Sequence, residues 1–236
     1  MDEYDPATFP RFAVTVDLVV CTIHEAKLHV LLIERGEEPY RGLLALPGGF
    51  VRPSESIEGA ARRELAEETG IEVAPDAPGL EQLATYGDPP RDPRMRVVSV
   101  AFVALLADLA QPAAGGDAEA ATLVEMGKAM ESQLAFDHHK ILSDGLERVR
   151  GRLEYTSIAT SFCPPEFSMG TLRAVYETVW AMELDPGNFR RKILTSGMVE
   201  PIDRLQRSTG PSGGRPAQLY RPTGGLRPID PPFKRQ

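Results

Sequence analysis

One acidic segment, residues 49–71, constrains the fold of this chain more than any other stretch of its sequence. Glu64, Glu67 and Glu68 stand at positions i, i+3 and i+4, so a helix through them would carry all three carboxylates on one face. Three like charges so close repel one another and destabilise a helix in which they have no partner. The segment therefore predicts a glycine-rich loop followed by one helix whose acidic face binds a cation.

Composition narrows the class of protein. The chain has 236 residues, of which 42% are hydrophobic and 25% charged, values typical of a folded globular protein. Its two cysteines, Cys21 and Cys163, lack CxxC spacing, which argues against a disulfide framework or a zinc site and suits a reducing cytosol. The N-terminus has no signal-peptide pattern and no apolar run is long enough to span a bilayer. We therefore expect a cytoplasmic protein with no membrane partner.

The charge is distributed unevenly along the chain. Residues 1–184 carry 16 lysines and arginines against 30 aspartates and glutamates, whereas residues 185–236 carry 10 against 4. An acidic body with a basic end indicates that the end meets a polyanion. The simpler alternative is a solvated basic face.

The first part of the chain alternates strand patterns with helices. A helix is expected after Asp137, a good N-cap residue, with His138 and His139 as solvated positions in it. This pattern predicts a mixed sheet between helices, α+β or α/β/α in character, over residues 1–155. The expected strands cover residues 12–23, 27–33, 43–51, 81–86, 95–107 and 122–126.

The second part has the pattern of a small DNA-binding module. Ser168 can cap one helix, and Asp185 followed by proline can start another that ends at Gly197. Two short strands, 202–207 and 217–221, follow across a turn rich in glycine and proline. Two helices and a hairpin outline a winged helix-turn-helix domain over residues 156–222. The remaining residues, 223–236, are rich in glycine and proline and predict a disordered tail.

The acidic segment fills every fixed position of a known pattern, Gly-x5-Glu-x7-Arg-Glu-hydrophobic-x-Glu-Glu-x-Gly-hydrophobic. Oxygen ligands of this kind suit a hard divalent cation, Mg²⁺ or Mn²⁺. The pattern resembles that of the Nudix family, which implies an α/β/α Nudix sandwich. The resemblance also implies the roles of particular residues. Gly49, Glu64, Glu67 and Glu68 would bind the metal, and Glu67 and Glu68 would act in catalysis, with Arg63 and Glu55 orienting the helix.

A second set of residues is expected to bind the ligand. Arginines on stiff backbone suit phosphates, and a proline-rich segment at residues 87–94 stands beside several of them. The same segment resembles that of Nudix proteins of the ADP-ribose group, so ADP-ribose is the first ligand expected and other dinucleotide-like pyrophosphates the second. Surface arginines in a loop are the alternative reading. The candidate ligand-binding residues are Arg35, Gly48, Gly49, Arg91, Arg94 and Arg96.

The basic C-terminal module supplies candidate DNA contacts. A helix that presents Asn188, Arg191 and Lys192 outward has the side chains that bind base edges and phosphates. Arg215, at the tip of the hairpin, could reach a minor groove or the backbone. The alternative is a helical dimerisation appendage with a solvated basic face. The full set of candidates is Asn188, Arg190, Arg191, Lys192, Thr195 and Arg215.

Two further motifs, Asn-Phe-Arg-Arg-Lys-Ile-Leu at residues 188–194 and Gly-Arg-Pro-Ala-x-Leu-Tyr-Arg at residues 214–221, extend the resemblance. Together with the Nudix pattern they resemble the Nudix-related transcriptional regulators of NAD metabolism, the NrtR family. This resemblance implies a homodimeric repressor of genes for NAD biosynthesis or salvage. Such a repressor binds a palindromic double-stranded operator, and ADP-ribose or a related NAD metabolite releases it.

The intact acidic pattern keeps a second function open, because many members of that family have a damaged one. The alternative is a Mg²⁺-dependent ADP-ribose pyrophosphatase with an accessory C-terminal domain, or a regulator that also hydrolyses its ligand. A hydrolase needs a general base beyond the acidic helix. Glu119, Glu125 and Glu131 are the candidates in the sequence that follows.

Overall fold

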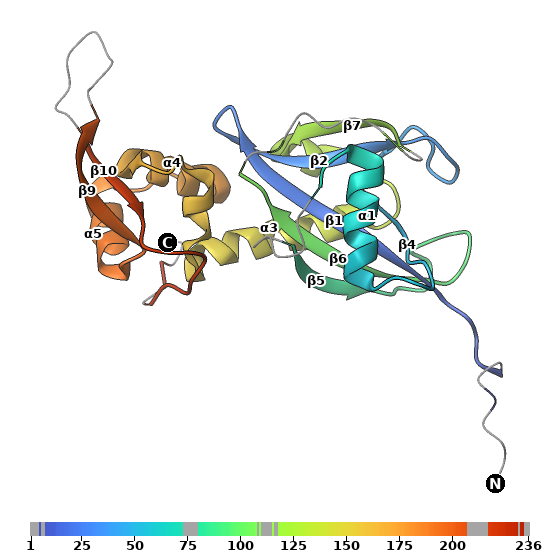
Figure 1. The fold of residues 1–236 in the computed structure, drawn as a ribbon. Coiled ribbons are helices and arrows are strands. Elements are labelled where there is room, and N and C mark those ends of the chain that lie inside the picture. The colour runs from blue at the N-terminus through green and yellow to red at the C-terminus, as the bar shows by residue number, and fades with distance from the viewer. Residues whose placement is uncertain are drawn as a thin grey trace.

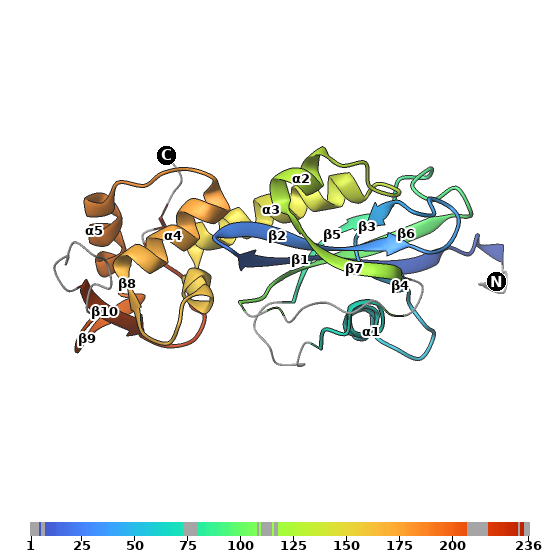
Figure 2. The same ribbon diagram turned by 90° about the horizontal axis from the view of Figure 1, so that it is seen from above.

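A computed structural model describes residues 5, 8–72, 80–107, 109, 115, 118–206, 217–230 and 232–233. Within them, the first module is a mixed seven-stranded sheet with α1 on one face and α2 and α3 on the other (Figure 2). This is the predicted α/β/α sandwich. Its elements are β1 (Ala13–His24), β2 (Lys27–Arg35), β3 (Leu44–Ala45), β4 (Gly48–Phe50), α1 (Ile57–Thr69), β5 (Glu81–Tyr86), β6 (Val97–Leu105), β7 (Ala118–Glu125), α2 (Met126–Glu131) and α3 (His138–Tyr155).

Strand β1 lies at the centre of this sheet. It pairs parallel with β6 and antiparallel with β2 and β4. Its side chains alternate between the two faces: Val16 and Leu18 pack with Leu65 of α1, whereas Val19 packs with Leu142 of α3. The alternation fixes the register of β1 and holds the two helices on opposite sides of one strand.

The second module contains the two helices and the hairpin predicted for a winged helix, and a third short strand, β8, which was not predicted, completes a sheet in the order β8-β10-β9 (Figure 1). Helix α3 runs from the first module into it, so the division at residue 155 stays a prediction. The module's elements are a 3₁₀ helix (Ser157–Phe162), β8 (Phe167–Ser168), α4 (Met169–Trp180), α5 (Pro186–Ser196), β9 (Val199–Gln206) and β10 (Ala217–Pro222).

The predicted helix starts and stops are observed where capping residues stand. The Ser168 hydroxyl accepts the Thr171 N–H at 3.1 Å, and the Asp185 carboxylate accepts the Asn188 N–H at 2.7 Å. Gly197 ends α5 with a φ of 64°, a left-handed conformation that glycine adopts without steric cost. Local capping residues therefore predicted the start of α4 and both ends of α5 correctly.

The prediction of a disordered tail is wrong for residues 223–230 and 232–233. The main-chain N–H groups of Ile229 and Phe233 donate to the carbonyls of Tyr155 and Glu154, both at 2.8 Å, and both side chains are buried. Glycine and proline favour an irregular backbone path, as the composition indicates. The burial of Ile229 and Phe233 stabilises this segment, and composition alone does not reveal that burial.

Candidate functional site

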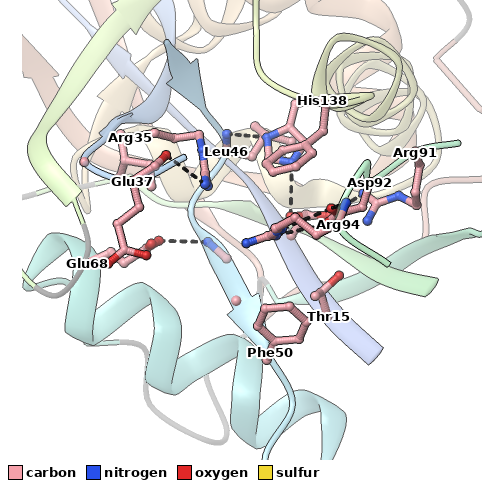
Figure 3. Close-up of a pocket in the computed structure, with 16 residues that line it drawn as sticks. Thr15, Arg35, Glu37, Leu46, Phe50, Glu68, Arg91, Asp92, Arg94 and His138 are labelled. Carbon is pink, nitrogen blue, oxygen red and sulfur yellow. Dashed lines mark hydrogen bonds and ion pairs between the residues drawn. The ribbon is translucent and has the colours of Figure 1, made fainter. Parts of the chain in front are cut away.

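A cleft of about 710 Å³, counted with its open mouth, lies where β1, β2 and β4 meet the start of α3 (Figure 3). The segment at residues 87–94 closes one side, and α1 contributes Glu68 from the other. The cleft is lined by Thr15, Asp17, Ile33, Arg35, Gly36, Glu37, Leu46, Gly48, Gly49, Phe50, Glu68, Arg91, Asp92, Arg94, Phe136 and His138.

Two glycines let α1 approach the sheet closely. A Cβ added to Gly49 would lie 2.3 Å from Oε1 of Glu64, and one added to Gly48 would lie 2.1 Å from the carbonyl oxygen of Val16. The Gly48 N–H donates to Glu68 at 2.8 Å (Figure 3). A larger residue at position 48 would clash with the backbone of β1, whereas one at position 49 would displace the Glu64 carboxylate.

Arg63 binds the acidic face of α1. Its guanidinium donates to both carboxylate oxygens of Glu55, at 2.6 and 2.9 Å. The same group donates through Nη1 to Glu64 at 2.7 Å and to Glu67 at 2.9 Å. The hydrogen bonds from Arg63, helped by the Arg52 N–H, lower the pKa of Glu55 to about 2. One arginine thus binds three carboxylates and connects α1 to the preceding loop.

The acidic residues fit a divalent cation by their chemistry but not by their arrangement in this structure. Oxygen is their sole donor type, as Mg²⁺ and Mn²⁺ require. However, among the residues that the structure describes, no three acidic, histidine or cysteine side chains come close enough to hold a metal ion. Arg63 Nη1 lies against both Glu64 and Glu67, while Glu68 turns to Gly48. Metal binding would require Glu64 and Glu67 to leave Arg63.

Two of the predicted ligand-binding arginines, Arg35 and Arg94, face the cleft together. The Arg35 side chain is held by the carbonyls of Pro39 and Glu37, at 2.9 and 3.3 Å. Both guanidinium groups lie over the ring of Phe136. Partial burial, followed by the neighbouring charge of Arg94, lowers the pKa of Arg35. Arg94 itself pairs with Asp92 at 2.8 Å, and the hydrogen bond to Asp92 raises the pKa of Arg94. Two guanidinium groups on one side of the cleft supply donors suited to a diphosphate.

The other two predicted arginines have structural contacts instead. The Arg91 side chain is only 4% exposed and donates to Asp17 at 3.1 Å and to Asp137 at 2.7 Å. Its guanidinium touches the cleft but is occupied by two carboxylates. Arg96 does not line the cleft; it donates to the Gly87 carbonyl at 2.6 Å and lies over Phe12. Arg91 and Arg96 therefore stabilise the segment at residues 87–94 and its neighbours, and neither offers a free guanidinium group to a ligand in the cleft.

Sequence reasoning missed the buried pair of Asp17 and His138. The expectation of a solvated His138 is wrong, since its Nδ1 accepts the Leu46 N–H at 2.9 Å and its Nε2 lies 3.4 Å from Asp17. Burial raises the pKa of Asp17, but His138, Arg91 and a hydrogen bond from Ser99 together lower it to about 2. A polar residue that interrupts an apolar strand, as Asp17 does, was the one available signal.

Two of the three candidate general bases, Glu125 and Glu131, do not reach the cleft. Glu125 pairs with Lys27 at 2.8 Å at the far end of β7. Glu131 is exposed at the end of α2, and neither residue lines the cleft. The side chain of Glu119 lies outside the described part of the structure. The structure therefore brings neither Glu125 nor Glu131 to the acidic helix.

Helix α5 carries the candidate DNA contacts on its outer side. Arg190, Arg191 and Thr195 are exposed, and Arg191 donates to the Asn188 side chain at 2.8 Å. Lys192 differs from the expectation of an outward side chain, because its Nζ lies 4.8 Å from the centre of the Phe233 ring. Arg215 lies outside the described residues.

The comparisons with known proteins agree with both modules. The family described as "NUDIX domain" matches residues 12–145, and the family described as "NrtR DNA-binding winged helix domain" matches residues 159–221. The chain is 35% identical over 221 residues to the ADPR responsive transcriptional repressor NtrR of Acinetobacter baylyi, which covers 93% of this chain and 85% of that protein.

Two further relatives match one or both modules. The chain is 39% identical over 132 residues to the ADP-ribose pyrophosphatase of Methanocaldococcus jannaschii, which covers 56% of this chain and 72% of that protein. The crystal structure of Shewanella oneidensis NrtR complexed with a 27mer DNA is similar with a TM-score of 0.70 and 29% identity, over 89% of this chain and 93% of that chain.

The fold and the cleft define a Nudix protein with a winged helix attached. More particularly, the chain belongs to the NrtR family. The family assignment made from the sequence motifs is therefore confirmed.

Proposed function

We propose that this protein is an ADP-ribose-responsive transcriptional repressor of genes for NAD biosynthesis or salvage, acting in the cytoplasm. The observation that carries the proposal is one chain with two sites: a cleft with Arg35 and Arg94 in the Nudix module, and an exposed basic helix α5 in a winged-helix module. The relative from A. baylyi is named for both properties, as an ADPR responsive repressor. None of the described helices is both long and apolar enough to cross a membrane.

The cleft suits the diphosphate of ADP-ribose through Arg35 and Arg94. The ligand would draw these two arginines together, because an anion between them removes their repulsion. Helix α3 begins at the cleft with His138 and ends beside the winged helix. A ligand that shifts the start of α3 would change the position of α5 and favour a state that no longer matches the operator.

We further propose a homodimer, since a palindromic operator requires two winged helices related by a two-fold axis. Light scattering during size-exclusion chromatography measures this directly. A mass of twice the 25.8 kDa chain is expected. A monomer at the micromolar concentrations that bind DNA would contradict the dimer without touching the repressor proposal.

The test of the repressor proposal is fluorescence anisotropy with a labelled duplex from the region upstream of the protein's own gene. We expect DNA binding that weakens with salt and with added ADP-ribose. Asn188→Ala and Arg191→Ala should each weaken binding. Lys128→Ala, which removes the same charge as Arg191→Ala from an exposed position of α2, should not. No binding at moderate salt, or binding that ADP-ribose leaves unchanged, would refute the proposal.

The cleft residues have a matched control of their own. Arg94→Met should weaken ADP-ribose binding at least tenfold in isothermal titration calorimetry, because a charge-assisted contact to the diphosphate is lost. Arg96→Met removes an arginine near the same loop but outside the cleft and should leave that affinity unchanged. Equal losses in both variants would place the ligand elsewhere.

A second candidate function is hydrolysis of ADP-ribose by water to AMP and ribose 5-phosphate. The specific observation in its favour is the intact set of Glu64, Glu67 and Glu68 beside the cleft, and the relative named ADP-ribose pyrophosphatase matches this module. When bound, Mg²⁺ would neutralise the diphosphate. AMP release with Mg²⁺ or Mn²⁺, abolished by Glu68→Gln, is the expected result. No AMP at protein concentrations that bind the ligand would refute it.

A further inference from the structure

The last described residues of the chain, 226–230 and 232–233, join the end of α3 to the winged helix (Figure 1). They follow the segment matched by the winged-helix family, which ends at residue 221. The Ser157 N–H donates to the Arg227 carbonyl at 2.9 Å, and Thr156 forms an antiparallel bridge with Pro228. The segment is therefore paired with the chain that leaves α3.

The same segment satisfies the C-terminal end of α3. The last carbonyl groups of a helix have no partner within the helix. Here the Tyr155 carbonyl accepts the Ile229 N–H and the Glu154 carbonyl accepts the Phe233 N–H, both at 2.8 Å. The end of α3 and the C-terminal segment consequently form one hydrogen-bonded unit.

Phe233 connects this unit to both helices of the winged helix. Its side chain is 5% exposed and stacks on Trp180 of α4, with ring centres 5.3 Å apart. It also meets Tyr176 of α4 edge to face at 5.3 Å and Phe189 of α5 at 5.4 Å. Aromatic pairs in these geometries add to the energy of burial and fix the relative orientation of the rings.

The contacts of the segment with α5 involve a predicted DNA-binding residue. The ammonium group of Lys192 lies over the Phe233 ring, 4.8 Å from its centre, which favours one position of a long flexible side chain. A second link is the hydrogen bond from the Arg227 guanidinium to the carbonyl of Gly197, which caps α5. The C-terminal segment thus contacts α5 in its middle, at Lys192, and at its C-terminal end, at Gly197.

We propose that Phe233 is a positioning residue for DNA binding, which holds α5 and Lys192 on the end of α3. The inference rests on the proposed function. Because α3 begins at the cleft, the segment also lies on the physical route by which a ligand there reaches α5. Coupling between two distant sites requires connecting elements with few alternative arrangements. The hydrogen-bonded end of α3 and the packed aromatic cluster around Phe233 are elements of this kind.

The experiment compares Phe233→Ala and Phe233→Leu with Leu226→Ala, which removes an exposed apolar side chain from the same segment. DNA affinity is measured by anisotropy on the duplex from upstream of the protein's own gene, with and without ADP-ribose. Phe233→Leu keeps most of the buried volume, so this variant should still fold. Circular dichroism verifies the folding of each variant.

We expect Phe233→Ala to weaken DNA binding at least tenfold and Phe233→Leu about threefold, with Leu226→Ala within twofold of the wild type. ADP-ribose should bind the free variants as it binds the wild type, yet change their DNA affinity by a smaller factor. A merely structural role would not lower this factor while leaving ligand affinity intact.

Three results would overturn the inference. DNA binding by folded Phe233→Leu that equals the wild type would show that the ring does not position α5. Tighter binding would show that the segment masks Lys192 instead. No DNA binding by the wild type would refute the proposed function, and the inference with it.

Discussion

Arg91→Met separates the structural role of this arginine from the ligand-binding role that the sequence predicts. The substitution leaves Asp17, whose side chain is 7% exposed, and Asp137 without their shared cation. Removing one partner of a buried ion pair costs about 3–5 kcal/mol, because the remaining charge stays desolvated. We therefore expect the free energy of unfolding of the Nudix module to fall by about this amount, measured by urea denaturation followed by far-ultraviolet circular dichroism.

Arg94→Met is the matched comparison. Its side chain is 39% exposed, but its removal leaves Asp92, whose side chain is 4% exposed, without its cation, so stability should fall by about 1–3 kcal/mol, less than in Arg91→Met, which leaves two carboxylates. ADP-ribose affinity should fall in Arg94→Met and hold in Arg91→Met at temperatures where that variant is folded. The reasoning is refuted if Arg91→Met keeps its stability and loses the ligand. A double variant, Arg91→Met with Asp17→Asn, should recover part of the lost stability.

Three further predictions concern the packing and charge of the same module. Gly48→Ala places a Cβ against the backbone of β1 and should lower the free energy of unfolding by about 1–3 kcal/mol or more. In the control, Gly127→Ala, the added Cβ has nothing within 4 Å, so stability should be unchanged. Equal melting temperatures of the two variants would contradict this prediction. The ionised form of Asp17 stabilises the fold above its ordinary pKa of 3.8, and this stabilisation, about 2 kcal/mol, should disappear as the pH falls towards 2. Urea unfolding at pH 5 and near pH 2.5 measures it, and Asp17→Asn should lose that part of the pH dependence. Burial raises the pKa of Cys21 to about 12, so a thiol reagent should modify it only in concentrated urea; rapid labelling of the native protein would contradict the structure.

Much of the fold could be predicted because its signals are local. The caps Ser168 and Asp185 and the left-handed Gly197 act within one turn of their helices, so residue type was sufficient. The spacing of Glu64, Glu67 and Glu68 likewise placed them on one helix next to the cleft. The short elements, such as α2 and β8, carry too few residues for a periodic pattern.

The partners of charged side chains could not be predicted, because they come from distant parts of the chain. Arg91 meets Asp17 and Asp137, which stand 74 and 46 residues away. For the same reason, the sequence did not show that Asp137, at the start of α3, binds an arginine instead of capping its helix. Phe233 is a further case, since nothing local indicates that a proline-rich end will bury an aromatic ring.

We propose that this one chain couples ADP-ribose binding in the cleft to DNA binding by α5. Thermodynamic linkage makes this coupling reciprocal: if ADP-ribose weakens DNA binding by some factor, DNA must weaken ADP-ribose binding by the same factor. Isothermal titration of ADP-ribose into the free protein and into the protein saturated with operator DNA measures this factor directly. We expect weaker binding to the DNA complex, by the factor found from anisotropy. Equal affinities in the two titrations would contradict the account.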